Sequence, residues 1–311
     1  MTTNQLRTNL ATSTAPTRPA WLPVTEFPFT SRWLAVDGHL IHYLDEGVGP
    51  TMVFLHAGPA WSFVYRDLIV GLRDRFRCIA LDLPGTGLSR AAAGYRPSIE
   101  AGAAVFSAFV RALDLRRVTL VTHDVGTPVA LGAAIEMPER VVGLSVIEGF
   151  AWALADEHPR IARTLRIVGS RPVGVLNDAF NLLARITASR AGAGRHLSAA
   201  GRRSLLGPYR ERAVRHNATA MLGDAADAAA YLRRLDTQLP AALGDCPLLL
   251  VFGSASPTVR ERFPQRWRAS FPNAQLVLVP GAHHFPMNDA PDLVADAISS
   301  WWTAAVTSPT R

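Results

Sequence analysis

The sequence predicts an α/β fold with a mostly parallel sheet flanked by helices. Short apolar runs rich in β-branched residues alternate with longer segments of helical periodicity, the pattern of parallel strands joined by helices. Several of these runs end in glycine-containing turns. The chain has 311 residues and is 49% hydrophobic, which is enough to fill the core of one large domain with an insertion.

Two strands are predicted in the first third of the chain. Residues 51–56 form an apolar run that enters the turn Ala57-Gly58-Pro59. The backbone of this turn can present a free N–H group. Residues 76–82 form a second run, which continues into a loop with two glycines at Gly85 and Gly87.

The third strand carries the most informative feature of the chain. The apolar run 118–123 ends abruptly at Asp124, and the pattern turns helical near Gly126. A sharp strand-to-helix turn needs small residues around its central position, and Thr122 and Gly126 meet that need. Such a turn exposes its central side chain, so Asp124 is a candidate nucleophile. A carboxylate with a reference pKa of about 3.9 is ionised near pH 7 and can attack carbon without losing a proton. The structural alternative is that Asp124 only caps the following helix.

The chain divides after the next predicted strand, residues 141–147. From Glu148 the pattern is helical and alanine-rich until about Gly244, and residues 247–252 resume the sheet. Residues 275–279 form the last strand, followed by a loop with two histidines and a helix from Pro291. We therefore expect a disordered leader at residues 1–25, a first core segment at 26–149, a helical cap at 150–244 and a second core segment at 245–306.

Four stretches together resemble the α/β-hydrolases and, within that fold, the haloalkane dehalogenases. They are His56–Arg66, Leu81–Ser89, His123–Gly126, and His284-Phe285 ahead of Asp289-Ala290-Pro291. The resemblance spans roughly residues 28 to 305. It implies an α/β-hydrolase fold with a mostly parallel sheet of eight strands flanked by helices, in which residues 141–147 are the sixth strand. A helical cap inserted after this strand roofs a pocket at the carboxyl ends of the strands. It also implies a hydrolase that needs no cofactor and no metal.

The resemblance assigns the other catalytic roles. In the related motif the catalytic histidine directly precedes an aromatic residue, which selects His284 over His283. Many α/β-hydrolases carry an aspartate after the seventh strand, where this chain has Ser256. Some haloalkane dehalogenases instead place a glutamate after the sixth strand, which corresponds here to Glu148. We expect Glu148 to be the catalytic acid and Ser256 to be dispensable, since a serine cannot stabilise imidazolium by charge.

These roles imply a two-step cycle. Asp124 displaces a leaving group and becomes an alkyl ester, and His284, oriented by Glu148, then activates the water that attacks the ester carbonyl carbon. Backbone N–H groups of Val125 and Gly58 would hold the oxyanion.

The chain departs from the family at the leaving-group site. Haloalkane dehalogenases hold the departing halide with a tryptophan directly after the nucleophile, and commonly with an asparagine in the His-Gly-Asn-Pro turn. This chain has Val125 and Gly58 at those places, and neither side chain can donate a hydrogen bond. Four residues remain as candidates for lining the substrate and leaving-group pocket: Trp61, Trp152, Phe150 and Tyr209.

Three functions therefore stay open. The first is a haloalkane dehalogenase with a rebuilt halide pocket. The second is an epoxide or lactone ring opener, including decarboxylation of a β-lactone. Epoxide opening usually needs two cap tyrosines, and the insertion holds only Tyr209 and Tyr231. The third is a non-catalytic small-molecule receptor, against which a complete set of Asp124, Glu148 and His284 argues.

Charge and composition bear on partners and location. The net charge is +7, and all 32 basic residues are arginine. This uniform bias indicates a genome-wide habit rather than a selected patch. Arginines are denser between Arg160 and Arg215, without interleaved aromatic platforms, so we expect a small-molecule substrate and no nucleic-acid partner. No apolar run is long enough to span a membrane, and residues 1–22 lack the apolar centre of a secretory signal. The two cysteines are predicted to be buried free thiols in a cytoplasmic protein.

Overall fold

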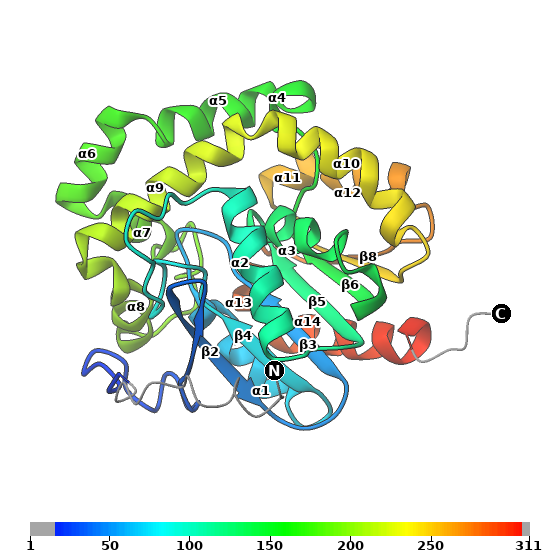
Figure 1. The fold of residues 1–311 in the computed structure, drawn as a ribbon, viewed down its shortest axis with the longest axis horizontal. Coiled ribbons are helices and arrows are strands. Elements are labelled where there is room, and N and C mark those ends of the chain that lie inside the picture. The colour runs from blue at the N-terminus through cyan, green and yellow to red at the C-terminus, as the bar shows by residue number, and fades with distance from the viewer. Residues whose placement is uncertain (1–15, 307–311) are drawn as a thin grey trace, which may run out of the picture.

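The computed structural model describes residues 16–306 and confirms the predicted α/β architecture (Figure 1). One sheet has the strand order β1-β2-β4-β3-β5-β6-β7-β8. The pairs β1–β2 and β2–β4 are antiparallel, and all other neighbours are parallel. The strands are Arg32–Val36 (β1), His39–Glu46 (β2), Thr51–Leu55 (β3), Arg77–Leu81 (β4), Val118–His123 (β5), Val141–Ile147 (β6), Leu248–Gly253 (β7) and Gln275–Val279 (β8).

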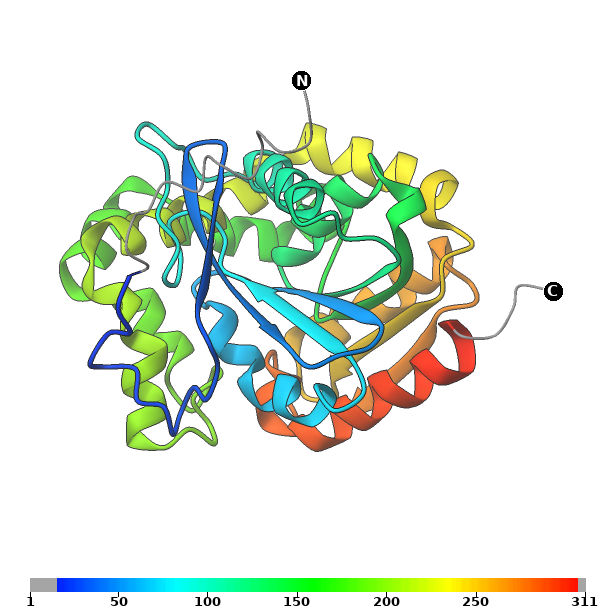
Figure 2. The same ribbon diagram turned by 60° about the horizontal axis from the view of Figure 1, so that its bottom comes forward.

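The helices of the core cover both faces of this sheet. They are Arg66–Leu72 (α1), Ile99–Ala112 (α2), Gly126–Ala134 (α3), Pro257–Arg260 (α11), Phe263–Ser270 (α12), Pro286–Asp289 (α13) and Pro291–Trp301 (α14). In Figure 2, α2 lies above the sheet, and α1 and α14 lie together below it. Strands β5 and β7 are buried along their whole length, as expected for parallel strands covered on both faces.

Seven helices lie between β6 and β7 and form the cap. They are Leu154–Glu157 (α4), Pro159–Val168 (α5), Arg171–Phe180 (α6), Leu182–Thr187 (α7), Ala199–Leu206 (α8), Arg212–Asp227 (α9) and Ala229–Leu243 (α10). Figure 1 shows α5, α6 and α9 arching over one end of the molecule. Within residues 16–306, no helix combines the length and the hydropathy that a membrane crossing requires.

The parallel strands bring the ends of four segments to one edge of the sheet. Leu55 pairs with Thr122, His123 with Ile147, and Ile147 with Val251. The residues that directly follow β3, β5, β6 and β7 therefore lie side by side. This edge is where ligands bind in open parallel sheets.

Part of the predicted leader is packed rather than disordered. Residues 1–15 lie outside the described part of the chain. From Pro16 onward the segment follows the core: Leu22 is buried, and Arg18 donates to the carbonyls of Phe27 and Phe29 at 2.8 and 2.6 Å. The polar composition concealed these contacts, which join residues up to 11 positions apart.

Cys78 follows the prediction of a buried free thiol, and Cys246 follows it in part. Cys78 is buried and Cys246 is partly buried, and both are free thiols. Burial raises the pKa of each thiol to about 12, so neither is a ready nucleophile.

Candidate active site

Asp124 sits at a strained turn between β5 and α3. Its φ is +45°, in the left-handed region that few residues other than glycine adopt readily. The turn is closed by a hydrogen bond from the Thr127 N–H to the Asp124 carbonyl at 2.9 Å. At Gly126, a Cβ atom would come within 2.5 Å of the His56 carbonyl oxygen, so no larger residue fits there. This close approach places the end of β3 directly against the turn.

The structure brings Asp124, His284 and Glu148 together. His284 Nε2 lies 3.5 Å from Asp124 Oδ2, and His284 Nδ1 lies 3.4 Å from Glu148 Oε2. Glu148 is fully buried, whereas the side chains of Asp124 and His284 remain 23% and 31% exposed. The predicted nucleophile and the predicted base are thus open to a ligand, and the residue predicted to orient the base is not.

The two carboxylates determine the charge of His284. Burial alone would lower its pKa, but the contacts with Asp124 and Glu148 outweigh that effect and raise the pKa to about 10. For Asp124, burial would raise the pKa, but His284 and the backbone N–H of Val125 lower it below its ordinary value. In the resting protein at neutral pH, an imidazolium therefore lies between two carboxylates, and Asp124 is ionised.

Glu148 is held by the segment that follows β7. The Gly253 N–H donates to Glu148 Oε1 at 2.6 Å, and the Ser256 hydroxyl donates to Oε2, also at 2.6 Å. The Thr258 hydroxyl donates to the same oxygen. Ser256 was expected to be dispensable for catalysis, which stays a prediction. Its hydroxyl nevertheless solvates Glu148, the predicted catalytic acid.

Two neutral histidines hold the loops around the site. His123 Nε2 donates to the His284 carbonyl oxygen at 2.8 Å, and burial lowers the pKa of His123 to about 3. His56 accepts from the Leu83 N–H through Nε2 at 3.0 Å, so its Nδ1 carries the proton and donates to the Ala57 carbonyl at 2.7 Å. Burial also lowers the pKa of His56. His283, the residue before His284, anchors the loop after β8 through its backbone N–H, which donates to Asp289 Oδ2 at 2.9 Å.

The predicted oxyanion donors come from two segments, the turn that carries Asp124 and the loop that follows β3. The Val125 N–H already interacts with the Asp124 carboxylate, while the Val125 side chain is buried in the core. Gly58 is only partly buried, and a Cβ atom added there would meet no atom within 4 Å. Gly58 therefore borders open space.

Two of the aromatic pocket candidates, Trp61 and Tyr209, already donate their polar hydrogens to backbone carbonyls. The Trp61 indole donates to the Leu205 carbonyl at 3.2 Å, and the Tyr209 hydroxyl donates to the Ala60 carbonyl at 2.9 Å. Both side chains are buried and tie the cap to the core. Their polar hydrogens are therefore not free to donate to a leaving group, and their place in the lining of the pocket stays a prediction.

The other two candidates also pack in the interior. Phe150 is buried in the core cluster beneath α2 and α3. Trp152 is buried against Phe263 and Trp267, with ring centroids 5.1 and 5.5 Å away. Its indole N–H has no hydrogen-bond partner among residues 16–306. Trp152 thus keeps a free donor, but one enclosed by aromatic rings.

Sequence reasoning missed the cradle around Glu148. The signal that could have revealed it is the Ser256-Pro257-Thr258 motif, in which Ser256 caps α11 by accepting from the Thr258 N–H. In the part of the chain described by the structure, no three His, Cys, Asp or Glu side chains form a group that could hold a metal ion.

The chain is similar in sequence and in structure to several known proteins. Residues 50–291 match the family model described as alpha/beta hydrolase fold. Haloalkane dehalogenase 2 from Mycobacterium tuberculosis is 38% identical over 281 residues, which cover 88% of this chain and 94% of that protein. Cis-3-alkyl-4-alkyloxetan-2-one decarboxylase from Shewanella oneidensis is 29% identical over 304 residues, 92% of each chain. In structure, the haloalkane dehalogenase DatA from Agrobacterium tumefaciens superposes with a TM-score of 0.75 at 22% identity, covering 89% of this chain and 97% of that one.

Proposed function

The chain belongs to the α/β-hydrolase family and is a haloalkane dehalogenase-like hydrolase, and we propose that it acts through a covalent alkyl ester on Asp124. The observation that carries this proposal is the contact of one imidazole, that of His284, with both Asp124 and the buried Glu148. A helix-capping aspartate would need no such partners.

In the first step, Asp124 Oδ attacks a saturated carbon of the substrate. A carbon–oxygen bond forms while the bond to the leaving group breaks, and the leaving group departs with the electron pair. The low pKa of Asp124 keeps the attacking oxygen ionised, so no base is needed in this step.

Ester formation then changes the protonation of His284. The Asp124 charge is one of the two contacts that raise the pKa of His284, and the ester no longer carries that charge. The pKa of His284 therefore falls towards the range in which a neutral imidazole can accept a proton from water. His284 is thus an imidazolium in the resting protein and a neutral base after the ester has formed.

In the second step, water adds to the Asp124 carbonyl carbon as His284 takes its proton. Glu148 stabilises the imidazolium, and the N–H groups of Val125 and Gly58 stabilise the oxyanion. Collapse of the intermediate breaks the ester carbon–oxygen bond, and His284 returns a proton to the departing alkoxide. Asp124 is left as a carboxylic acid, and its proton passes to His284, where it replaces the proton that His284 lost to solvent when the ester formed. For a haloalkane, the net products are an alcohol, a halide ion and one proton.

A second candidate is opening of a β-lactone ring. It is favoured by the leaving-group site, where Val125 and Gly58 offer no side-chain donor for a halide. A lactone oxygen stays tethered to the substrate and does not need a separate halide site. Epoxide opening is less well supported, because Tyr209 and Tyr231 donate to the carbonyls of Ala60 and Pro128 rather than facing Asp124.

A single-turnover experiment in H2(18)O tests the ester. With enzyme in excess over 1-bromobutane, we expect the label in Asp124 and not in the first molecule of butanol, because water attacks the enzyme's carbonyl carbon. Asp124→Asn should release bromide more than about 10⁴-fold more slowly, whereas the exposed control Asp114→Asn should match the parent. Label in the first product would contradict the ester. If no halide is released, turnover of a cis-dialkyl β-lactone with the same labelling of Asp124 would select the second candidate.

A further inference from the structure

The net positive charge of the protein arises in the cap, because arginines and acidic residues are equal in number in the rest of the chain. Residues 150–244 contain 14 arginines and 7 acidic residues, while the rest of the chain contains 18 arginines and 18 acidic residues. A compositional bias towards arginine would raise its number throughout the chain, but arginine makes up 14 of the 95 residues of the cap and only 18 of the other 216, while acidic residues are about equally frequent in both parts. This finding corrects the interpretation of the arginines as a genome-wide habit alone.

The imbalance is largest in the outer part of the cap. Residues 158–215 contain 12 arginines and only 2 acidic residues, Asp178 and Glu211. Seven of these arginines are exposed and their side chains make no ion pair or hydrogen bond within residues 16–306: Arg160, Arg163, Arg171, Arg185, Arg190, Arg203 and Arg210. Exposed arginines outside the cap are also mostly without a carboxylate partner, so the distinguishing feature of residues 158–215 is the density of arginine and the shortage of acidic residues, not the lack of pairing.

Helix α6 in this region turns its apolar side outward. Val175, Leu176 and Phe180 are 67%, 48% and 60% exposed, and their spacing puts them on one helix face. The one buried residue of α6 is Asn177, which donates to the Arg215 carbonyl and the Thr219 hydroxyl, each at 3.0 Å. A helix that packs only on its own protein shows the opposite arrangement.

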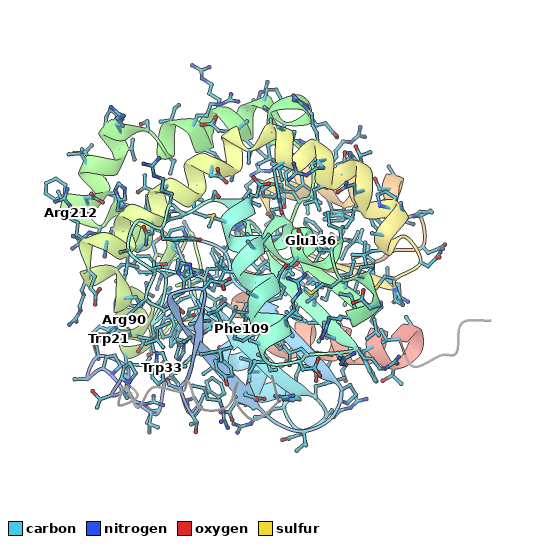
Figure 3. All side chains as sticks on the ribbon, viewed as in Figure 1. Trp21, Trp33, Arg90, Phe109, Glu136 and Arg212 are labelled. Carbon is cyan, nitrogen blue, oxygen red and sulfur yellow. The ribbon has the colours of Figure 1, made fainter. Side chains whose placement is uncertain are left out.

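Neighbouring helices extend this apolar stripe. Leu182 and Ile186 on α7 and Ile167 on α5 are also exposed, so residues 167–186 contain six of the eleven large exposed hydrophobic side chains among residues 16–306. Figure 1 shows α5, α6 and α7 at the outer end of the cap, and Figure 3 shows Arg212 projecting outward at the same end. We call the exposed side chains of α5, α6 and α7 the cap-tip surface.

We propose that the cap-tip surface docks onto an anionic phospholipid bilayer. Apolar side chains surrounded by unpaired arginines are the composition of helices that lie in a membrane interface, with the apolar groups at the acyl boundary and the cations at the phosphates. The helices lie on the bilayer and do not cross it. This inference does not depend on the reaction at Asp124.

Two other occupants fit the surface less well. A second copy of the chain would bring two arginine-rich surfaces of the same sign together, which is repulsive. A nucleic acid would satisfy the arginines but would leave the aliphatic stripe without a partner, since Phe180 is its only aromatic ring for base stacking.

Co-sedimentation of the full chain with vesicles tests the proposal. The probes are vesicles of 30% phosphatidylglycerol in phosphatidylcholine and vesicles of phosphatidylcholine alone. We expect binding to the anionic vesicles that weakens strongly in 0.5 M salt, where screening is more effective. Each arginine near an anionic surface strengthens binding about five-fold, so Arg171→Glu with Arg185→Glu should weaken binding by about 30-fold or more.

The apolar stripe is tested separately. Leu176→Ser with Phe180→Ser should weaken binding by about ten-fold or more, because the side chains inserted into the acyl boundary are lost. The matched controls are Arg268→Glu and Leu293→Ser, exposed residues of the same types on α12 and α14. They should bind as the parent does, and all variants should keep its melting temperature.

Three results would overturn the proposal. The first is equal sedimentation with both kinds of vesicle, or with neither. The second is binding to anionic vesicles that the cap-tip variants leave unchanged. The third is a concentration-dependent dimer in sedimentation velocity that Leu176→Ser with Phe180→Ser abolishes, without any vesicle binding, which would assign the surface to a second copy.

Discussion

Gly58→Asn should convert a poor site for chloride departure into a better one. Gly58 lies in the loop that follows β3, beside the Asp124 turn, and a Cβ atom at Gly58 would meet nothing within 4 Å. Its backbone is not in the positive-φ region that would penalise a side chain. The amide of an asparagine can therefore enter open space and donate to a leaving halide.

The size of the effect follows from the charge on the acceptor. A hydrogen bond to a charged group contributes about 1.5–3 kcal/mol, and each 1.4 kcal/mol changes a rate about ten-fold. Gly58→Asn should thus accelerate chloride release by about 10- to 100-fold, with little change in melting temperature. Val125→Trp should behave differently, because Val125 is buried and overpacking of a core costs about 1–3 kcal/mol of stability.

Halide release from 1-chlorobutane and 1-bromobutane measures this effect. Chloride, the poorer leaving group, should gain more than bromide. The matched control is Gly58→Leu, which adds a similar volume without a donor and should not accelerate either substrate. A folded Gly58→Asn protein with an unchanged chloride rate, or equal acceleration by Gly58→Leu, would refute the reasoning.

Three further predictions concern the residues around the nucleophile. Glu148→Gln should lower kcat by about 10³- to 10⁴-fold, because it removes the charge that stabilises imidazolium. Ser256→Ala should lower kcat by about ten-fold, because it removes one donor to Glu148. Equal mild effects in stopped-flow turnover would show that Glu148 has no catalytic role. Because the pKa of His284 is raised, its protonated form should stabilise the fold fully below about pH 6.5, and this contribution should be lost as the pH rises towards about 10. The melting temperatures of the parent and of His284→Phe should therefore converge over that range. A constant difference would exclude the ion pairs of His284 with Asp124 and Glu148. Tyr209→Phe should cost about 1 kcal/mol of stability with unchanged kcat, since its hydroxyl only ties the cap to Ala60; a large loss of kcat would return Tyr209 to the chemistry.

Local sequence patterns were enough to predict the edge of the sheet that carries the site. The strands at residues 141–147 and 275–279 were predicted with the bounds observed for β6 and β8. Their apolar runs end at turn residues, so the local pattern and the buried environment agree. The turn at Asp124 was predicted for the same reason, since only small neighbours fit where β5 passes directly into α3.

The features that were missed depend on contacts between distant segments. Ser256 and Glu148 are 108 positions apart, and Trp61 and Leu205 are 144 positions apart. The hydrophobic periodicity of a sequence cannot predict which carbonyl an indole N–H will contact, or which hydroxyl will solvate a buried carboxylate. The packing of Leu22 escaped prediction for the same reason, because its polar neighbours suggested a free segment.

Intact-protein mass spectrometry of His284→Phe tests the ester on Asp124 most directly. In the proposed mechanism His284 acts only in the second step, so this variant should still be alkylated and should gain the mass of one butyl group from 1-bromobutane. Peptide mapping should place that mass on Asp124. The neighbouring His283→Phe is the matched control and should turn over without accumulating the adduct. An unlabelled Asp124 in His284→Phe, with a substrate that the parent converts, would contradict the covalent mechanism.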